Sequence, residues 1–388
     1  MKITSITTTP LQLPVAHTPY ITKGAGTKYH WGRRGRISPK RPTPILEYIL
    51  VRIETDEGVF GIGESQVDIG YFGNTLEGVQ AVLDDYLGPQ LIGQDPTNRE
   101  YLMGVIDYRG NSCAKAGIDL ALHDLLGKIL ATPVSTLIGG RHQLRIPVSV
   151  EIAGGPPEAM AAECLKFMDQ GIRAFKPKIG GHPDKDADRL CAIREAIGPD
   201  VSLRADANQG YTPKEAIKLC CLAEKYDIGL ELLEQPIPAW DLQGMAAVRR
   251  SVNTLIEADE SCYSIHDAMQ IIRHQAADVL NIKIGKAGGL TNAKKIAAIA
   301  EAAGLKCVLG TAFGLGIEMA AKLHLAASSM MVTEAVEFTE IGLHDNLLAA
   351  PQSSQFALPL EDGCLPVPAG PGLGVALAED KVKRYTLP

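Results

Sequence analysis

One pattern recurs five times between residues 175 and 289, and this stretch decides the fold. Its repeats read FKPKIGG (175–181), LRADANQG (203–210), LELLEQP (230–236), LIEADES (255–261) and LNIKIGKAGG (280–289). Each repeat is a short apolar run that ends in charged residues and is followed by Gly, Pro, Asn or Ser. Intervals of 24 to 28 residues separate Lys178, Asp206, Glu234, Asp259 and Lys283. Each interval has room for one strand, one helix and two short loops.

From about residue 145 onward, the pattern predicts strands alternating with helices. The expected strands are 146–151, 173–178, 201–206, 229–234, 254–259, 278–283, 306–311 and 333–338. Several helical runs between them open with Pro or Thr and close at Gly. Eight βα units in about 200 residues are typical of a TIM-type barrel. A doubly wound open sheet is the second interpretation, but it gives no reason for charges at so many consecutive strand ends.

The first 130 residues predict a separate α+β capping domain. Residues 1–15 and 45–65 alternate as strands do, with a hairpin turn at 56–58, and residues 75–130 follow a helical period. The intervening segment 16–44 carries seven Lys and Arg residues and no acid. It is expected to be either a lid over an anionic substrate or a solvated basic loop.

The rest of the chain divides into two further parts. A barrel is expected over 140–350, and the Pro- and Gly-rich segment 351–388 is expected to pack back on the capping domain. In the helical part of that domain, His123 is read as a packing residue, because a lone His on a helix more often packs than binds a ligand.

Composition excludes several classes of protein. The 388 residues are 46% hydrophobic and 21% charged, as in ordinary globular proteins, and the net charge of −7 argues against nucleic-acid binding. No apolar run is long enough to predict a membrane span, and the N-terminus lacks an apolar signal core. The eight cysteines form no C-x-x-C pair, which favours reduced thiols and a cytoplasmic protein.

Three acids are candidates for a metal site. Asp206, Glu234 and Asp259 each end a separate predicted strand, and parallel strand ends meet at one rim of a barrel. Carboxylate oxygens with waters suit Mg²⁺ or Mn²⁺, and no His lies beside them to favour zinc. The alternative is a set of ion pairs with the rim lysines. Asn208 could orient a ligand or water, and Glu260 is expected to support the site from behind.

The lysines are candidate bases. Strand alternation puts Lys176 and Lys178 on one face, where mutual repulsion and partial burial favour a neutral amine. Lys283 ends the sixth strand with Asn281 on the same face, opposite the second strand, whereas Lys286 is a weaker candidate. Lys178 and Lys283 could therefore face opposite sides of one bound carbon. The chemistry implied is proton abstraction next to a carboxylate, with the metal neutralising the enolate-like charge.

At these residues the chain resembles the enolase superfamily, specifically its muconate-lactonizing-enzyme subgroup. The motifs that carry the resemblance are Lys176-Pro177-Lys178, Asp206, Glu234 of EQP, Asp259 of ADES and Lys283 of NIKIGKAGG. The resemblance covers nearly the whole chain and implies an α+β cap, a (β/α)7β barrel and a symmetric homo-oligomer. It also implies that Lys178 and Lys283 form the acid/base pair, that Lys176 modulates Lys178, and that the three acids hold the metal.

The resemblance narrows the reaction only in part. The mandelate-racemase-like subgroup uses a His after the seventh strand, and VLGTAFGLGI (308–317) has none. Dipeptide epimerases carry Asp-x-Asp after the eighth strand, where this chain has Glu337 and Glu340. The Thr339-Glu340 pair looks more like the muconate cycloisomerases. Alternatively, Glu337 and Glu340 hold the ammonium of an amino-acid substrate, or are rim residues.

The function expected from the sequence is a metal-dependent isomerase that acts on a small carboxylate. Cycloisomerisation stands ahead of racemisation or epimerisation, and a dehydratase that uses the same intermediate is the alternative enzyme class. A binding barrel without catalytic activity should lack a metal acid or a lysine, and none is missing.

Overall fold

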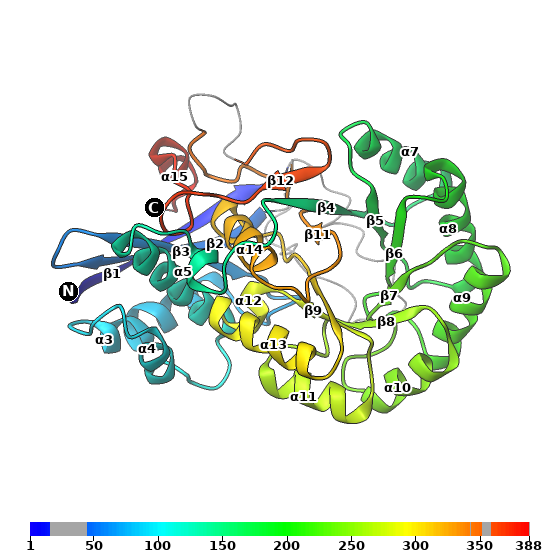
Figure 1. The fold of residues 1–388 in the computed structure, drawn as a ribbon, viewed down its shortest axis with the longest axis horizontal. Coiled ribbons are helices and arrows are strands. Elements are labelled where there is room, and N and C mark those ends of the chain that lie inside the picture. The colour runs from blue at the N-terminus through cyan, green and yellow to red at the C-terminus, as the bar shows by residue number, and fades with distance from the viewer. Residues whose placement is uncertain (16–44, 342, 351–357, 388) are drawn as a thin grey trace.

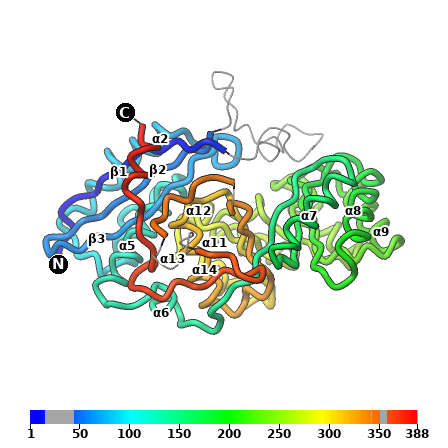
Figure 2. Tube along the Cα trace, turned by 90° about the horizontal axis from the view of Figure 1, so that it is seen from above, coloured from blue at the N-terminus to red at the C-terminus, as the bar shows by residue number. Residues whose placement is uncertain are grey.

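A computed structural model describes residues 1–15, 45–341, 343–350 and 358–387. An N-terminal sheet with its helices lies beside a ring of parallel strands surrounded by helices (Figure 1). The view from above shows the same two parts next to each other, with the C-terminus returning to the N-terminal part (Figure 2). The expected lid, residues 16–44, lies outside the described residues.

The N-terminal sheet has three antiparallel strands in the order β1-β2-β3. They are β1 (Ile3–Pro14), β2 (Ile45–Thr55) and β3 (Phe60–Val67). The predicted hairpin joins β2 to β3, and Gly58 in its turn has φ +78°, a conformation that glycine adopts without strain. The hairpin prediction is therefore confirmed.

Helices cover one face of this sheet. They are α2 (Leu76–Ala81), the π-helix η2 (Val82–Leu87), α3 (Gly88–Leu91), α4 (Arg99–Val105), α5 (Ser112–Ile129) and α6 (Val134–Leu137). The long helix α5 lies directly on β3. A Cβ atom at Gly63 would lie 2.0 Å from Gly117 O, so this close approach requires glycine at position 63. The α+β cap predicted from the sequence is present.

The second part is a nearly closed parallel barrel. Its strands are β4 (Arg145–Ile152), β5 (Ala174–Pro177), β6 (Ser202–Asp206), β7 (Leu232–Glu234), β8 (Leu255–Ala258), β9 (Val279–Ile282), β10 (Lys306–Leu309) and β11 (Val336–Glu337). They pair in the order β10-β9-β8-β7-β6-β5-β4-β11, and Cys307 at the start of β10 bridges to Val332, ahead of β11. Every predicted strand overlaps an observed one. The (β/α)7β barrel is confirmed over the doubly wound sheet.

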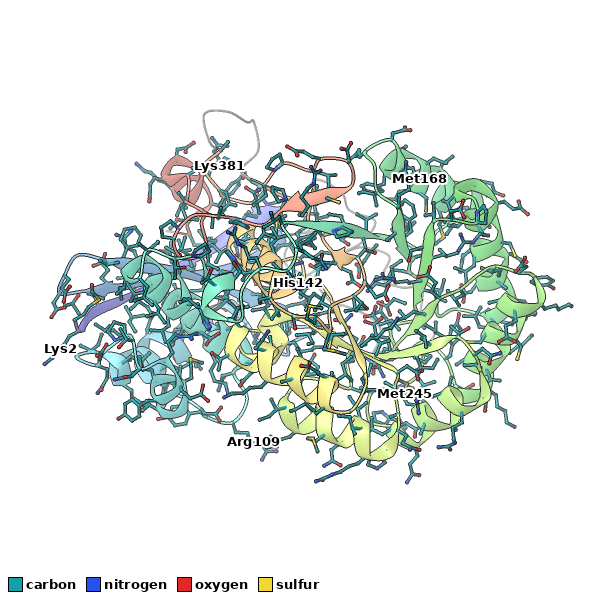
Figure 3. All side chains as sticks on the ribbon, in the orientation of Figure 1. Lys2, Arg109, His142, Met168, Met245 and Lys381 are labelled. Atoms are coloured by element: carbon teal, nitrogen blue, oxygen red, sulfur yellow. The ribbon has the colours of Figure 1, made fainter. Side chains whose placement is uncertain are left out.

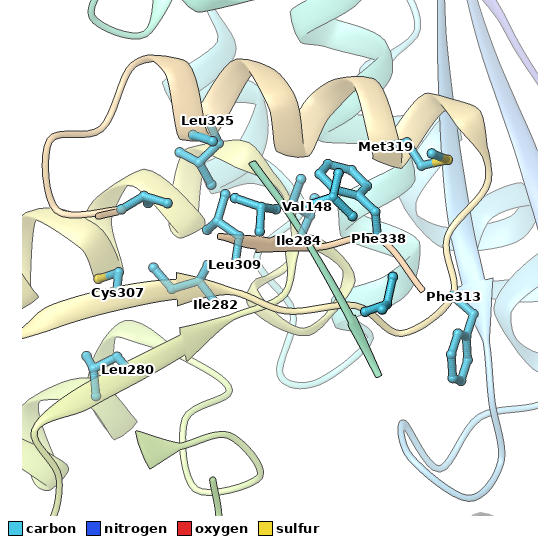
Figure 4. Packing of buried hydrophobic residues seen from close by; sticks show 14 of the residues in the cluster. Val148, Leu280, Ile282, Ile284, Cys307, Leu309, Phe313, Met319, Leu325 and Phe338 are labelled. Carbon is cyan, nitrogen blue, oxygen red and sulfur yellow. The ribbon is translucent and has the colours of Figure 1, made fainter. Parts of the chain in front are cut away.

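Helices form the outer layer of the barrel. They are α7 (Pro157–Met168), α8 (Pro183–Ile197), α9 (Pro213–Lys225), α10 (Leu242–Ser251), α11 (Ile265–His274), α12 (Ile284–Ala287), α13 (Leu290–Ala302) and α14 (Gly316–Ala327). The outward faces of the strands pack against them, as Ile282, Leu309 and Leu325 show near α14 (Figure 4). Helix α9 begins with a capping box between Thr212 and Glu215, which fixes its start.

The inward faces of the strands divide the barrel interior into two zones. Leu232, Val279 and Val308 form a small apolar cluster, with Leu255 packed against it. Toward the carboxyl ends, the inward positions are polar or charged instead. This apolar floor supports a buried polar zone in which the predicted site residues lie.

The C-terminal segment contacts both parts of the molecule. Strand β12 (Cys364–Pro366) pairs antiparallel with β4, while Leu387 N, just beyond α15 (Glu379–Tyr385), donates to Pro10 O of β1 at 3.0 Å. Lys381, labelled on α15 in Figure 3, pairs with Asp345 at 2.9 Å. No helix in the described ranges has the length and apolar character needed to cross a membrane.

Candidate active site

The charged residues that end the repeats meet at the carboxyl rim of the barrel. Asp206 and Glu234 are the last residues of β6 and β7 and are direct register partners. Lys178, Asp259 and Lys283 each follow their strand by one residue. All five side chains are buried. The structure therefore brings together the metal acids and bases that were predicted from spacing.

Lys178 lies between two carboxylates. Its Nζ is 2.5 Å from Asp206 Oδ2 and 2.5 Å from Glu151 Oε1. Glu151 stands near the carboxyl end of β4 and was not singled out in the sequence. Its position at the end of the first predicted strand was the available signal. A lysine held between two acids is supplied with counter-charge.

Lys176, which comes one layer deeper in β5, sits in a ring of acids. Its Nζ contacts carboxylate oxygens of Glu234 and Glu337 and lies 3.6 Å from Glu151. Burial alone would lower the pKa of Lys176, but these acids raise it well above its usual value. The expected neutral amine is therefore wrong for Lys176, because the carboxylates outweigh the effect of burial.

Asp259 forms ion pairs with two lysines that follow β9 in the sequence. Its Oδ2 is 2.6 Å from Lys283 Nζ, and its Oδ1 is 2.6 Å from Lys286 Nζ. Burial alone would raise the pKa of Asp259, but the two lysines hold it well below its usual range. Lys286 also donates to Asn281 O at 2.9 Å. It therefore belongs to the site, for which the sequence made it only a weaker candidate.

The cap contributes an aromatic wall that the sequence did not predict. Tyr71, four residues after β3, donates its hydroxyl to Asp259 Oδ1 at 2.9 Å. Lys283 Nζ lies 4.8 Å from the centroid of the Tyr71 ring. Tyr263 stacks on Tyr71 and donates to its carbonyl at 2.8 Å. These contacts join residues almost 200 positions apart, so no local pattern could have indicated them.

The three predicted metal acids have suitable chemistry and location for a divalent cation. Burial and the charge of Asp206 raise the pKa of Glu234 well above its usual value. A divalent cation relieves such crowding of buried carboxylates. In this structure their oxygens face lysines, and within the described ranges no three Asp, Glu, His or Cys side chains converge as a ready-made metal cage. Metal binding therefore requires these side chains to turn away from the lysines.

Neighbouring amides position the metal acids. Asn281 Nδ2 donates to Glu234 Oε1 at 3.2 Å, and the backbone N–H of Asn208 donates to Asp206 Oδ1 at 2.7 Å. Asn208 Nδ2 also donates to Glu260 Oε1 at 3.2 Å. Gln235 Oε1 accepts from the Asp259 N–H at 3.0 Å, a role that the EQP motif alone did not reveal. These contacts hold the acids in place without occupying the centre of the rim.

Glu337 and Glu340, proposed from the sequence as substrate ligands, are both buried beside lysines. Glu337 contacts Lys176, as described above. Glu340 Oε1 is in contact with Lys322 Nζ at 2.5 Å, and its Oε2 accepts from Thr311 Oγ1 at 2.8 Å. Each acid is thus engaged within the protein, and Lys322 on α14 is a partner that the sequence did not identify.

Glu257 is a further buried acid that the sequence did not single out. It lies two residues before Asp259 on the inward face of β8, and both of its oxygens lack a hydrogen-bond partner within the described part of the chain. Burial raises its pKa to about 7. The alternation of β8 was the signal that could have identified it. His123, by contrast, lies on α5 away from the rim and bonds Asp119 O at 2.8 Å.

The chemistry that these buried lysines and acids support is proton transfer next to a carboxylate. The fold, the lysines at the ends of β5 and β9, and the acids between them define an enolase-type isomerase. Residues 44–139 match the mandelate racemase/muconate lactonizing enzyme N-terminal domain, and residues 159–381 match the enolase C-terminal domain-like family. The chain belongs to the mandelate racemase/muconate lactonizing enzyme family of the enolase superfamily.

Relatives of known activity fall into more than one class. N-succinyl-L-Arg/Lys racemase of Bacillus cereus is 33% identical over 100% of this chain and 98% of its own length. Chloromuconate cycloisomerase of Cupriavidus pinatubonensis is 34% identical over 87% of this chain and 90% of its own. The structure of the Enterococcus faecalis dipeptide epimerase with Mg and L-Leu-L-Tyr has a TM-score of 0.85 and 32% identity, covering 97% of this chain and 100% of that one. The chain is an isomerase of this family, and the relatives leave its substrate open.

Proposed function

We propose that the protein catalyses Mg²⁺-dependent proton transfer at the carbon next to a substrate carboxylate. Mg²⁺ would be held by Asp206, Glu234 and Asp259, which combine hard oxygen donors, burial and a common rim. When bound, the cation supplies positive charge for the substrate carboxylate and for the enolate that proton removal creates. The family relative solved with Mg supports this choice of ion.

The lysines divide into two roles. Lys178 and Lys283 stand at the rim on separate sides and would take and return protons at the reacting carbon. Lys176 lies deeper among Glu234, Glu337 and Glu151, remains charged, and would orient Lys178 and the acids rather than act as a base. The Tyr71 ring beside Lys283 would exclude water from that amine.

The ion pairs formed by the acids at and after the end of β11 are the observation that favours a particular substrate. Glu337 and Glu340 are paired with Lys176 and Lys322, and Asp345 is paired with Lys381. Acids that already form ion pairs with lysines are poor ligands for a substrate ammonium, because binding it would leave a buried lysine without its carboxylate partner. This arrangement supports a substrate without a free ammonium group. A muconate-type dicarboxylate that undergoes cycloisomerisation is the first candidate.

Racemisation of an N-acylated amino acid is the second candidate. Two lysines on separate strands, β5 and β9, suit removal of a proton from one side of a carbon and its return from the other. N-acylation removes the ammonium charge of the amino acid, so this substrate also lacks a free ammonium group. The full-length similarity to the N-succinyl-L-Arg/Lys racemase supports it.

A three-member substrate panel separates the candidates. The purified protein with Mg²⁺ is incubated with cis,cis-muconate, an N-succinyl-L-amino acid and an L-Ala-L-Glu dipeptide. Loss of the diene absorbance identifies cycloisomerisation, and loss of optical rotation identifies racemisation. Turnover of the dipeptide alone, with its free ammonium, would contradict the proposal. A β-hydroxy carboxylate, incubated separately under the same conditions, tests the dehydratase alternative, which predicts elimination of water from it.

A further inference from the structure

A second concave site lies on the outside of the molecule, where the cap meets the barrel helices. The cavity has a volume of about 720 Å³ and is bordered by α4, α5, α6 and α13. This volume falls within the range of small-molecule binding sites. None of its lining residues belongs to the catalytic rim. It is therefore a separate site, and inference about it does not depend on the proposed reaction.

Two cations line this cavity without a carboxylate partner. Within the part of the chain that the structure describes, no acid lies within ion-pair distance of Arg99 or Lys294. The Arg99 guanidinium contacts only a ring nitrogen of His123, and Lys294 Nζ donates to Ser328 O at 2.5 Å. Burial lowers the pKa of both cations. Partly desolvated cations that lack a direct ion-pair partner favour the binding of an anion beside them.

The neighbouring acids are already engaged elsewhere. Asp119 accepts from Thr291 Oγ1 at 2.5 Å and from Thr291 N at 3.1 Å. Glu100 pairs with Lys295 at 2.5 Å across the cavity, which joins the cap helix α4 to the barrel helix α13. The charges of Asp119 and Glu100 favour the charged form of Arg99 from a distance, but neither acid forms an ion pair with it. A bound anion would pair with Arg99 and Lys294 directly.

The remaining wall of the cavity is apolar. Leu126, Leu137, Ile138 and Leu290 contribute hydrocarbon surface beside the two cations. A bare inorganic anion would leave this surface in contact with water. An organic anion with a compact apolar body would cover it and satisfy the cations at the same time.

We propose that this cavity is a binding site for a small organic carboxylate with an apolar body. The carboxylate accepts hydrogen bonds from Arg99 and Lys294, and the body packs on the leucines of α5, α6 and α13. Because the cavity is bordered by helices of both domains, a bound ligand holds the cap and the barrel together. Binding at this site is separate from binding at the rim.

Benzoate is a suitable probe, because it joins one carboxylate to a compact apolar ring. Calorimetric titration of the Mg²⁺-loaded protein is expected to show saturable binding of benzoate. Arg99→Met should weaken that binding at least about tenfold, because it removes a charged hydrogen-bond donor. Ala298→Trp, which fills the cavity from α13, should also abolish it. Arg250→Met, at an exposed position on α10, is the matched control and should bind as the wild type does.

A rim variant distinguishes the two sites. Lys283→Met should keep the benzoate site, and Arg99→Met should keep the wild-type turnover number. The proposal is overturned if wild-type protein does not bind benzoate, or if Lys283→Met rather than Arg99→Met loses it. It is also overturned if the binding of inorganic phosphate requires Arg99 and the binding of benzoate does not.

Discussion

Lys283 Nζ lies 2.6 Å from Asp259 Oδ2, so a candidate base and a candidate metal ligand share one ion pair. The same holds for Lys178 and Asp206 at 2.5 Å. The metal and the lysines therefore compete for the same carboxylate oxygens. A cation at the rim would take over these oxygens and leave both amines free to face the substrate.

Removal of the metal should stop turnover without unfolding the protein. The lysine pairs hold the acids in its absence, so the barrel keeps its charge balance. Dialysis against EDTA is expected to abolish activity while circular dichroism stays unchanged, and added Mg²⁺ should restore the rate. Asp206→Asn should resist this rescue. Full activity after chelation would remove the basis for the metal site.

Breaking the buried pair between Lys322 and Glu340 should be costly. Lys322→Met leaves the Glu340 carboxylate buried without its cation, which typically costs about 3–5 kcal/mol. Urea unfolding measures this loss. The double variant with Glu340→Gln should recover much of the stability, because no charge then remains unpaired. Equal stability of the single and double variants would show that the pair is not coupled.

The interface between the cap and α14 should be sensitive to pH. Burial, with the charge of Glu318, raises the pKa of Glu64 to about 8, and burial raises that of Glu318 to about 7. Both start from 4.5, so the folded state binds these protons more tightly than the unfolded state. Their contribution to stability is fully present below pH 4.5 and is lost as the pH rises from there through about 7 to 8.

Glu318→Gln should remove part of this pH dependence. Its stability relative to wild type should increase between pH 5 and 8, by at most about 3 kcal/mol, because the wild-type acid must ionise while buried. Urea unfolding at both pH values provides the measurement. Glu301→Gln, at an exposed position on α13, should show the wild-type slope. A steeper slope for Glu318→Gln would reverse the sign argued above.

The Tyr71 hydroxyl should matter for catalysis more than for folding. Tyr71→Phe keeps the stacked ring but removes the hydrogen bond to Asp259, a bond of about 1.5–3 kcal/mol to a charged acceptor. A decrease of roughly tenfold in kcat is expected, with little change in the melting temperature. Tyr226→Phe, at an exposed position, is the control. An unaltered kcat would show that the Tyr71 hydroxyl has no role in catalysis and that the residue contributes only packing.

Much of the fold could be predicted because its signals are local. Strand ends such as Asp206 and Glu234 recur at βα intervals, and parallel topology then places them on one rim. Glu151 and Glu257 obey the same alternation and could have been found by applying it to every strand.

What could not be predicted depends on contacts between distant segments. The charge state of Lys176 is set by Glu234 and by Glu337, which lies 161 positions away, and Tyr71 reaches Asp259 from another domain. Spacing identifies residues that share a rim, but it does not identify which oxygen faces which amine. The engagement of Glu340 by Lys322 is of this kind. The limits of the domains and the lid role of 16–44 stay predictions.

The proton-transfer role of the two rim lysines can be tested directly by solvent isotope exchange. The protein with Mg²⁺ is incubated in D₂O with whichever panel substrate it turns over, and deuterium at the α-carbon of substrate and product is followed by NMR. We expect incorporation by the wild type and by the exposed-site control Lys214→Met. Loss of at least about a hundredfold is expected in Lys178→Met, in Lys283→Met or in both. Wild-type incorporation by both rim variants would contradict the account.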